Sequence, residues 1–208
     1  VDETGCYATT TQELIVHPIP TVLVGPAYEV CDDDYDGIGS YDLSTLDETL
    51  LDGQTGVSIS YYESQEDADN AANVLDVNYQ NTIADNQILY VRLEVDETGC
   101  YATTTQELIV HPLPEIIIPT PLEECDDDYD GIVSFFDLSQ KTEEILNGQT
   151  GISVSYYETI ENAESSENPI EALYTNIEVD NQTIYVRLVD NESSCISSTE
   201  FELSLIHI

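Results

Sequence analysis

The sequence has almost no basic residues. Only Arg92, Lys141 and Arg187 stand against 43 acidic residues, which gives a formal net charge of −40. Binding to the phosphates of nucleic acid needs many Lys and Arg side chains, and docking on anionic lipid needs them too. We therefore exclude nucleic acid and an anionic membrane surface as partners, and we expect affinity for divalent cations instead.

Long apolar runs are missing as well. A transmembrane helix needs about 18 or more consecutive apolar residues, and no such stretch occurs, so we expect no membrane insertion. The chain begins at Val1 without Met and shows no signal peptide, and we interpret it as an internal fragment of a longer protein. The acidity does not predict disorder, because 41% of the residues are hydrophobic and they form short alternating runs.

Patterns typical of catalytic sites are also absent. The three histidines lie beside prolines or near the chain end, at His17, His111 and His207. No arrangement of Ser or Cys with His and an acid points to a nucleophilic triad, and no carboxylate pair stands out for glycoside cleavage. We therefore predict that the protein is not an enzyme and that it binds no organic cofactor.

Internal duplication is the strongest feature that is present. Residues 1–20 recur as residues 95–114, with Ile19 replaced by Leu113 as the only difference. The motifs CDDDYDG, SYYE and YVRL also occur twice, starting at Cys31 and Cys125, Ser60 and Ser155, and Tyr90 and Tyr185. The repeat length of about 94 residues is typical of a small β-sandwich domain. We predict a strand of a preceding repeat with a linker at 1–20, and β-sandwich repeats at 21–114 and 115–208.

The hydrophobic pattern within each repeat favours strands. Residues 57–61 and 184–188 alternate with a period of two, and the Thr-rich residues 101–110 form a plausible last strand after a hairpin turn at 96–99. Residues 43–51 and 66–72 have the spacing of short helical turns. The predicted fold is all-β: tandem Ig-like antiparallel β-sandwich repeats, each with about seven short strands in two sheets, rather than a closed barrel.

The loop after the first repeated cysteine resembles a calcium loop. It has the pattern D-x-D-x-D-G, in which alternate carboxylates converge on one ion and the glycine permits a sharp turn. The usual bidentate Glu is missing, so this is not an EF-hand, and a nearby Asp has to help complete the shell. The predicted calcium ligands are Asp32, Asp34, Asp36 and Asp42, and in the second repeat Asp126, Asp128, Asp130 and Asp137. The alternative is an acidic turn whose Asp side chains cap backbone amides, although the repulsion among its carboxylates argues for a cation.

Five cysteines in an acidic, secreted-type chain indicate disulfides. The simplest pairing lies within each repeat, Cys31 with Cys100 and Cys125 with Cys195, and leaves Cys6 for an upstream repeat. The rival pairing crosses the linkers, Cys6 with Cys31 and Cys100 with Cys125. Free thiols also stay open, whereas metal binding by cysteine is disfavoured because there is no CxxC pair.

The succession of CDDDYDG, SYYE, YVRL, a Cys and a final ELIVHP strand resembles the tandem repeats of very large secreted surface proteins of Bacteroidetes. That resemblance implies an Ig-like module, a cell-surface location, export by type IX secretion, and a part in adhesion or gliding motility. It carries no catalytic residue.

These observations predict an extracellular structural segment of an adhesin or filament, stiffened by calcium and disulfides. Its partners would be the neighbouring repeats of the same chain and, through a distal tip, surface glycans or other cells. One alternative is a glycan- or protein-binding module that uses loops or the tyrosine pairs 61–62 and 156–157. Another is a fibre subunit that assembles by donor-strand exchange through the strand at 1–20.

Overall fold

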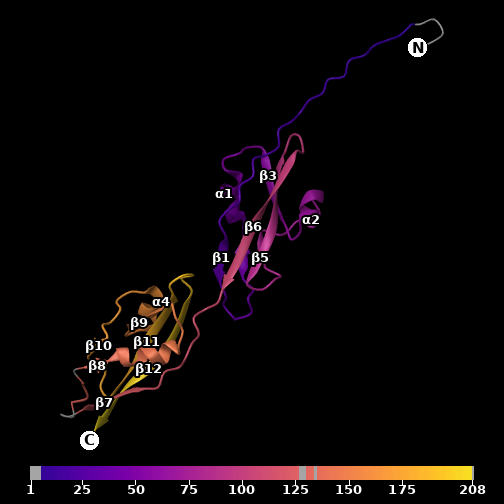
Figure 1. Ribbon diagram of the computed structural model, residues 1–208. Helices are drawn as coiled ribbons and strands as arrows, with labels where there is room; N and C mark the ends of the chain where they lie inside the picture. Colours follow the sequence, from indigo (N-terminus) through magenta and orange to yellow (C-terminus); the bar gives the residue numbers. More distant parts are fainter. Residues whose placement is uncertain (1–5, 127–129, 134, 208) are drawn as a thin grey trace. The chain divides into compact units, whose positions relative to one another are not determined.

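The computed structural model describes residues 6–126, 130–133 and 135–207 (Figure 1). It divides into two compact units. The first contains Val1–Tyr28, Ser40–Tyr79 and Gln87–Leu108, and the second contains Glu29–Gly39, Gln80–Asn86 and Ile109–Ile208. The second unit therefore includes the acidic loop of the first repeat together with the whole second repeat.

The first repeat contains six strands and three short helical segments. The four-stranded sheet has the order β1-β6-β5-β3, and β2 pairs with β4 in a second sheet. The elements are β1 (Tyr28–Cys31), β2 (Ser40–Asp42), η1 (Leu43–Leu46), α1 (Asp47–Leu51), β3 (Val57–Tyr62), α2 (Gln65–Asn70), β4 (Asn78–Gln80), β5 (Asn86–Val95) and β6 (Tyr101–His111).

The second repeat has the same elements in the same order. Its sheets are β7-β12-β11-β9 and β10-β8. The elements are β7 (Leu122–Asp126), β8 (Phe136–Asp137), η2 (Leu138–Lys141), α3 (Thr142–Leu146), β9 (Ile152–Tyr157), α4 (Ile160–Ser165), β10 (Leu173–Tyr174), β11 (Asn181–Asp190) and β12 (Ile196–His207).

The predicted tandem Ig-like sandwich is confirmed, with two differences. Each repeat has six strands rather than seven within the described residues. In addition, the first strand of the second repeat, β7, pairs with the last, β12, in parallel, whereas β11 pairs antiparallel with both β12 and β9. The predicted helical turns are confirmed as η1 with α1, and as α2.

The core lies between the two sheets of each repeat. Alternate residues of β5 point into it, and Leu89, Val91 and Leu93 have no exposed surface. In the second repeat Ile184, Val186 and Leu188 take the same places, and they pack with Phe136 and Leu138 from the smaller sheet and η2. Burying each of these side chains contributes about 1.5–3 kcal/mol, so the period-two pattern is the main source of the fold's stability.

Both tyrosines are buried in each of the pairs that the glycan-binding alternative would use. Tyr61 and Tyr62 are 3% and 1% exposed, and Tyr156 and Tyr157 are 6% and 1% exposed. In Figure 1, α1 and α2 lie on opposite sides of the four-stranded sheet, so side chains on both faces of β3 are covered. The tyrosine pairs are therefore structural and offer no platform on which a sugar ring can stack.

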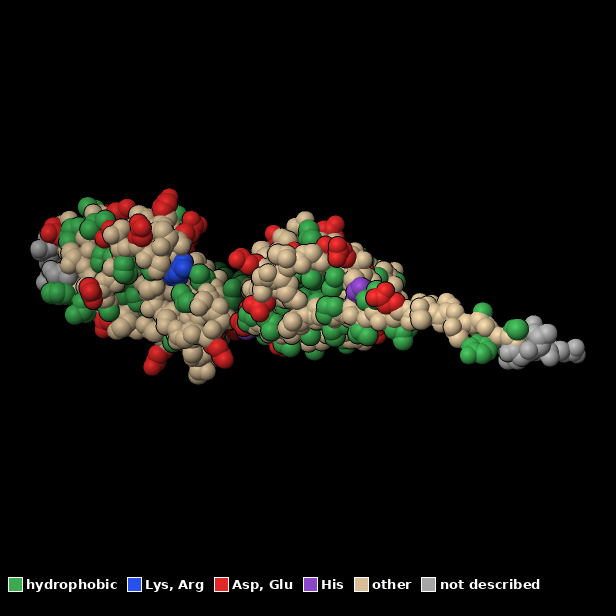
Figure 2. Space-filling model, turned by 90° about the horizontal axis from the view of Figure 1, so that it is seen from above, with side chains coloured by type: hydrophobic (Ala, Val, Ile, Leu, Met, Phe, Trp, Pro, Cys, Tyr) green, Lys and Arg blue, Asp and Glu red, His purple; other side chains and the backbone are tan. Residues whose placement is uncertain are grey.

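The charged side chains on the surface are mostly acidic. Figure 2 shows Asp and Glu spread over the visible face, where basic side chains are scarce. Among the helices of the described residues, none has the length and apolar character needed to cross a membrane. Residues 6–19 lie outside helices and strands, and every one of them is exposed.

Candidate functional site

The acidic loop that follows β1 brings three predicted ligands together. One carboxylate oxygen each from Asp32, Asp34 and Asp36 lie within 4.8 Å of one another, and no other such group occurs in the described part of the chain. Asp32 is 5% exposed, and the other two are exposed. Three carboxylate oxygens this close can converge on one hard cation such as calcium.

Asp32 organises the backbone of this loop. Its Oδ1 accepts hydrogen bonds from the backbone N–H groups of Tyr35 (2.8 Å) and Asp34 (3.2 Å), and its Oδ2 accepts one from Gly37 (2.9 Å). Burial acts to raise the pKa of Asp32, but these N–H donors, together with that of Asp36, outweigh it and hold the pKa below its usual value. Capping of backbone amides, the alternative reading of the motif, therefore describes Asp32 correctly.

Asp34 is in the opposite electrostatic situation. Loss of hydration, a side-chain hydrogen bond with Asp36, and the negative charges of Asp36 and Asp33 raise the pKa of Asp34 above its usual value. The loop therefore holds one carboxylate that backbone donors stabilise and one whose charge its neighbours oppose. A bound cation would relieve that opposition.

A buried asparagine that sequence reasoning missed holds the loop in place. The side chain of Asn81 donates to the carbonyls of Gly37 (2.9 Å) and Ile83 (2.8 Å), and its Oδ1 accepts from the N–H of Gly39 (2.6 Å). Asn176 donates to Gly131 in the same way in the second repeat. The pattern Y-x-N-x-x-x-D-N-Q, present at residues 79–87 and 174–182, is the signal that would have found both asparagines.

Gly37 is required where the loop closes. Its φ is +75°, and a Cβ there would lie 2.7 Å from Asp85 Oδ1 and 2.8 Å from Ala84 Cβ. The final glycine of the motif thus serves both the left-handed turn and a close approach to residues 84–85.

The other predicted ligands have different positions. Asp42 and Asp137 lie outside the carboxylate cluster found among the described residues; they cap η1 and η2 by accepting from the N–H groups of Ser44 and Ser139 at 3.1 Å. Their assignment as calcium ligands stays a prediction. In the second loop, Asp126 is buried and accepts from Gly131 N, and Asp130 accepts from Ile132 N. Asp128 lies outside the described residues.

The cysteine next to the acidic loop forms a disulfide with the second repeat. Cys31 bonds to Cys195, with a Cα–Cα distance of 5.6 Å, across 164 residues of sequence. Cys6, Cys100 and Cys125 are free thiols in this structure. The predicted pairings of Cys31 with Cys100 and of Cys125 with Cys195 are therefore wrong, and so are the rival pairings of Cys6 with Cys31 and Cys100 with Cys125.

The strand order explains why a pairing within one repeat fails. The N–H of Asp32 donates to the carbonyl of His111 (2.8 Å), so Cys31 lies beside the last residue of β6. Cys100 precedes the first residue of β6, which is 11 residues long. At about 3.3 Å per residue the two cysteines are separated by about 36 Å, far beyond the limit of about 7 Å between bonded Cα atoms.

Cys195 lies beside the same linker as Cys31. Two residues after it, the hydroxyl of Ser197 donates to the carbonyl of Pro114 at 2.7 Å. Residues 111–114 therefore bring Cys31, at the end of β1, next to Cys195, which directly precedes β12. The cross-repeat bond follows from β1 running parallel to the last strand of its own repeat.

A polar pocket of about 320 Å³ adjoins this linker, lined by His111, Pro112, Asp190, Glu192 and Ser193. The His111 ring contacts Glu29 at 2.9 Å. The N–H groups of Ser193 and Glu192 hold the pKa of Asp190 below its usual value, and the His111 ring adds to this effect. Asp190 and Glu192 thus belong to a hydrogen-bonded turn between β11 and β12.

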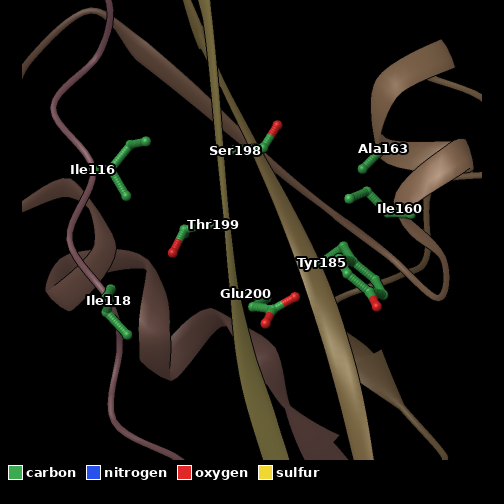
Figure 3. Close-up of a pocket in the computed structure, with 8 residues that line it drawn as sticks. All are labelled: Ile116, Ile118, Ile160, Ala163, Tyr185, Ser198, Thr199 and Glu200. Carbon is green, nitrogen blue, oxygen red and sulfur yellow. The ribbon is translucent and has the colours of Figure 1, made fainter.

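An apolar groove of about 360 Å³ lies on the outer face of the second repeat. Figure 3 shows Ile116 and Ile118 of the linker on one side of Thr199, with Ile160 and Ala163 of α4 on the other side. The hydroxyl of Thr199 donates to the carbonyl of Ile117 at 3.3 Å. The linker is therefore tied to β12 by Ser197 and Thr199, and the groove is the space that remains between the linker and α4.

Comparison with known proteins identifies a family. The family model described as "Flavobacterium inter-domain disulphide bond domain" matches residues 27–114 and again residues 121–208. No curated protein matches. The chain is similar to solved structures at low identity. The Ig1-2 module of the Drosophila receptor protein tyrosine phosphatase DLAR is 8% identical, with 91% of this chain and 100% of that chain covered and a TM-score of 0.25. Chicken VE-cadherin EC1-2 is 7% identical, with 88% and 99% covered and a TM-score of 0.25.

Proposed function

Because the chain belongs to the Flavobacterium inter-domain disulphide bond domain family, we propose that it is a structural segment of an extracellular repeat array braced by disulfides between neighbouring repeats. The bond between Cys31, in the first family match, and Cys195, in the second, carries this proposal. Neighbouring repeats of the same chain are thus its principal partners. We assign it no catalytic role.

The bond stabilises by restricting the unfolded chain. In the chain-entropy model a closure across 164 residues contributes about 5 kcal/mol. That is a large share of the stability of a small domain, which is about 5–15 kcal/mol. A bond of this kind also prevents one repeat from separating from the next under load, which suits a stalk or filament better than a free-standing binding domain.

The cellular setting follows from the same chemistry. Structural disulfides persist in oxidising compartments outside the cytosol. The net charge of −40 keeps neighbouring chains apart and soluble. A cell-surface location, export by type IX secretion and a role in adhesion or gliding complete the proposal, and they rest on the resemblance to secreted Bacteroidetes repeat proteins.

Calcium is the second part of the proposal. It is supported by the three close carboxylate oxygens of Asp32, Asp34 and Asp36 and by the raised pKa of Asp34. Backbone N–H groups of residues 34–37 occupy most of the acceptor positions of Asp32, so the exposed carboxylates of Asp34 and Asp36 would supply most of the oxygen ligands. Because Asp32 directly follows Cys31, calcium would stiffen the backbone that holds the disulfide.

Small-angle scattering on the oxidised chain and on Cys195→Ser tests the bracing role. We expect Cys195→Ser to widen the distribution of dimensions, and Cys125→Ser, which removes a free thiol, to leave it unchanged. Identical profiles for the native chain and Cys195→Ser would contradict the bracing role.

A further inference from the structure

Part of β12 forms an open edge of the four-stranded sheet in the second repeat. The N–H of Asp190 donates to the carbonyl of Cys195 at 2.9 Å, which shows which residues of β12 bond to β11. In an antiparallel pair this bonding alternates along the strand, so the backbone N–H and C=O groups of Ser198 and Glu200 point away from β11. On that side β7 begins opposite Leu203, and no other described strand pairs with β12. The backbone groups of Ser198 and Glu200 therefore have no strand partner among the described residues.

The apolar groove adjoins this open edge. Figure 3 shows Ile116 and Ile118 of the linker on the side of β12 that faces away from Tyr185 of β11. Ile116 is 44% exposed and Ile118 is 82% exposed, so both side chains are available for contact. A strand edge beside an apolar wall is the combination that an added strand uses, because its backbone bonds to the edge and its side chains enter the groove.

The charges around the groove favour a basic partner over a second copy of this chain. Glu200 lines the groove, is exposed, and forms no ion pair with any described residue. Glu161 and Glu164 of α4 are exposed as well. The neighbouring Arg187 is already engaged by the carbonyls of Ala163 (2.8 Å) and Glu164 (3.1 Å). Two copies with a net charge of −40 each repel one another, whereas a basic side chain in a facing strand pairs with Glu200.

The first repeat differs at two of these positions. Thr105 takes the place of Glu200, so the equivalent site carries no charge. Gln65 takes the place of Ile160, and its side chain donates to Thr103 at 3.1 Å, which joins α2 to β6 across the equivalent surface. The first repeat therefore serves as an internal control for binding at the second.

We propose that the second repeat binds an extended segment of a basic protein partner by strand addition to β12. The segment runs antiparallel to β12, and its backbone bonds to Ser198 and Glu200. A Lys or Arg lies opposite Glu200, and an aliphatic side chain two residues later lies opposite Ser198, against the linker isoleucines. This binding is additional to the bracing role and does not depend on it.

The experiment uses the oxidised full chain, labelled with ¹⁵N, and the synthetic peptide acetyl-Thr-Lys-Thr-Val-Thr-amide as the probe. In the antiparallel register this probe places its Lys opposite Glu200 and its Val opposite Ser198. We expect saturable shifts of the amide resonances of Ser198 and Glu200, and no shifts at the equivalent Thr103 and Thr105. The absence of saturable shifts at Ser198 and Glu200 would overturn the inference. The same shifts on concentrating the chain alone would also overturn it, because the occupant would then be a second copy.

Modified probes separate the backbone contribution from the charge. N-methylation of the Lys removes the N–H that donates to the Glu200 carbonyl and should weaken binding about 10-fold or more, whereas N-methylation of the central Thr, whose N–H faces away from β12, should change it less than about twofold. Replacing the Lys by Glu should also weaken binding about 10-fold or more. Equal affinities of the two methylated probes would exclude strand addition, and equal binding by the Glu probe would exclude a basic partner.

Matched variants of the chain locate the side-chain contacts. Ile116→Asn combined with Ile118→Asn removes the apolar wall and should weaken binding of the probe about 5–10-fold. Leu173→Asn, the same change at an exposed site outside the groove, should bind as the native chain does. Glu200→Gln should weaken binding about threefold, and Glu171→Gln, at an exposed position elsewhere, should not. Native affinity in the double Asn variant would overturn the assignment of the groove.

Discussion

The two repeats share two pairs of buried amide side chains but differ in their ion pairs. Asn81 and Asn176 hold the same loop carbonyls, and Gln87 and Gln182 donate to Tyr79 and Tyr174 at 2.8 and 2.7 Å. In contrast, buried Lys141, which donates to Thr120 and Glu144, replaces Leu46 of the first repeat. Buried amides thus maintain the fold, whereas ion pairs are local additions.

The arginines at equivalent positions of the two repeats share one role and differ in their further contacts. Arg92 and Arg187 both donate from Nη1 to the last carbonyls of the helix beside them, Ala68 and Ala163, at 2.8 Å. Only Arg92 also forms an ion pair with Glu94 (2.6 Å) and lies 3.4 Å from the centre of the Tyr101 ring. The capping role is common to both repeats, and the additional contacts belong to the first.

The largest expected difference between repeats concerns the front cysteines. Cys31→Ser should lower the free energy of unfolding by about 4–5 kcal/mol, because it removes the closure across 164 residues. Cys125→Ser should change it by less than about 0.5 kcal/mol, since that thiol is free. Urea unfolding of the oxidised chains measures both, and equal losses would mean that the two cysteines have equivalent bonds.

The loop asparagines should instead behave alike. Asn81→Ala and Asn176→Ala each remove the side-chain hydrogen bonds to the loop carbonyls together with the acceptor of a backbone N–H, that of Gly39 or Val133, so each should destabilise its repeat by about 2–3 kcal/mol. Thermal unfolding followed by amide exchange in each repeat checks this. A loss confined to one repeat would break the correspondence between the two loops.

The arginines should differ moderately. Arg92→Met removes the helix cap together with the ion pair and ring contact, whereas Arg187→Met removes the cap alone. We expect Arg92→Met to cost about 1–2 kcal/mol more in urea unfolding. The double variant Glu94→Gln with Tyr101→Ile removes the ion pair and the ring contact of Arg92. In that background, Arg92→Met should cost nearly the same free energy of unfolding as Arg187→Met does in the native chain.

The smallest expected effect concerns calcium and pH. Without calcium, Asp34→Asn should raise the melting temperature, because it removes a charge that Asp33 and Asp36 oppose. It should also abolish the calcium-induced rise, while Asp42→Asn, at a helix cap, should preserve it. Since the pKa of Asp34 is raised, this carboxyl takes up a proton at a higher pH than an ordinary Asp does. As the pH is lowered, calcium affinity should therefore begin to fall at a pH above the usual pKa of an Asp side chain. A calorimetrically measured affinity that stays unchanged down to about pH 4 would contradict this.

Much of the fold was predictable from the repeats. The alternation in residues 184–188 predicts a strand, and the spacing of apolar residues in 43–51 predicts helical turns. In both segments the pattern is informative because only one local structure buries all the apolar side chains together. The cysteine pairing was not predictable in this way, since it depends on whether β1 runs parallel to the last strand of its repeat. The capping of η1 and η2 by Asp42 and Asp137 was not predicted either, because a carboxylate two residues before a serine can cap a helix or bind an ion.

Peptide mapping of the full, non-reduced chain tests the central claim most directly. We expect a single peptide pair joined through Cys31 and Cys195, with Cys6, Cys100 and Cys125 available for alkylation. A pair joined through Cys31 and Cys100 would rule out the bracing disulfide, because it would place the bond within one repeat and leave the neighbouring repeats unbraced.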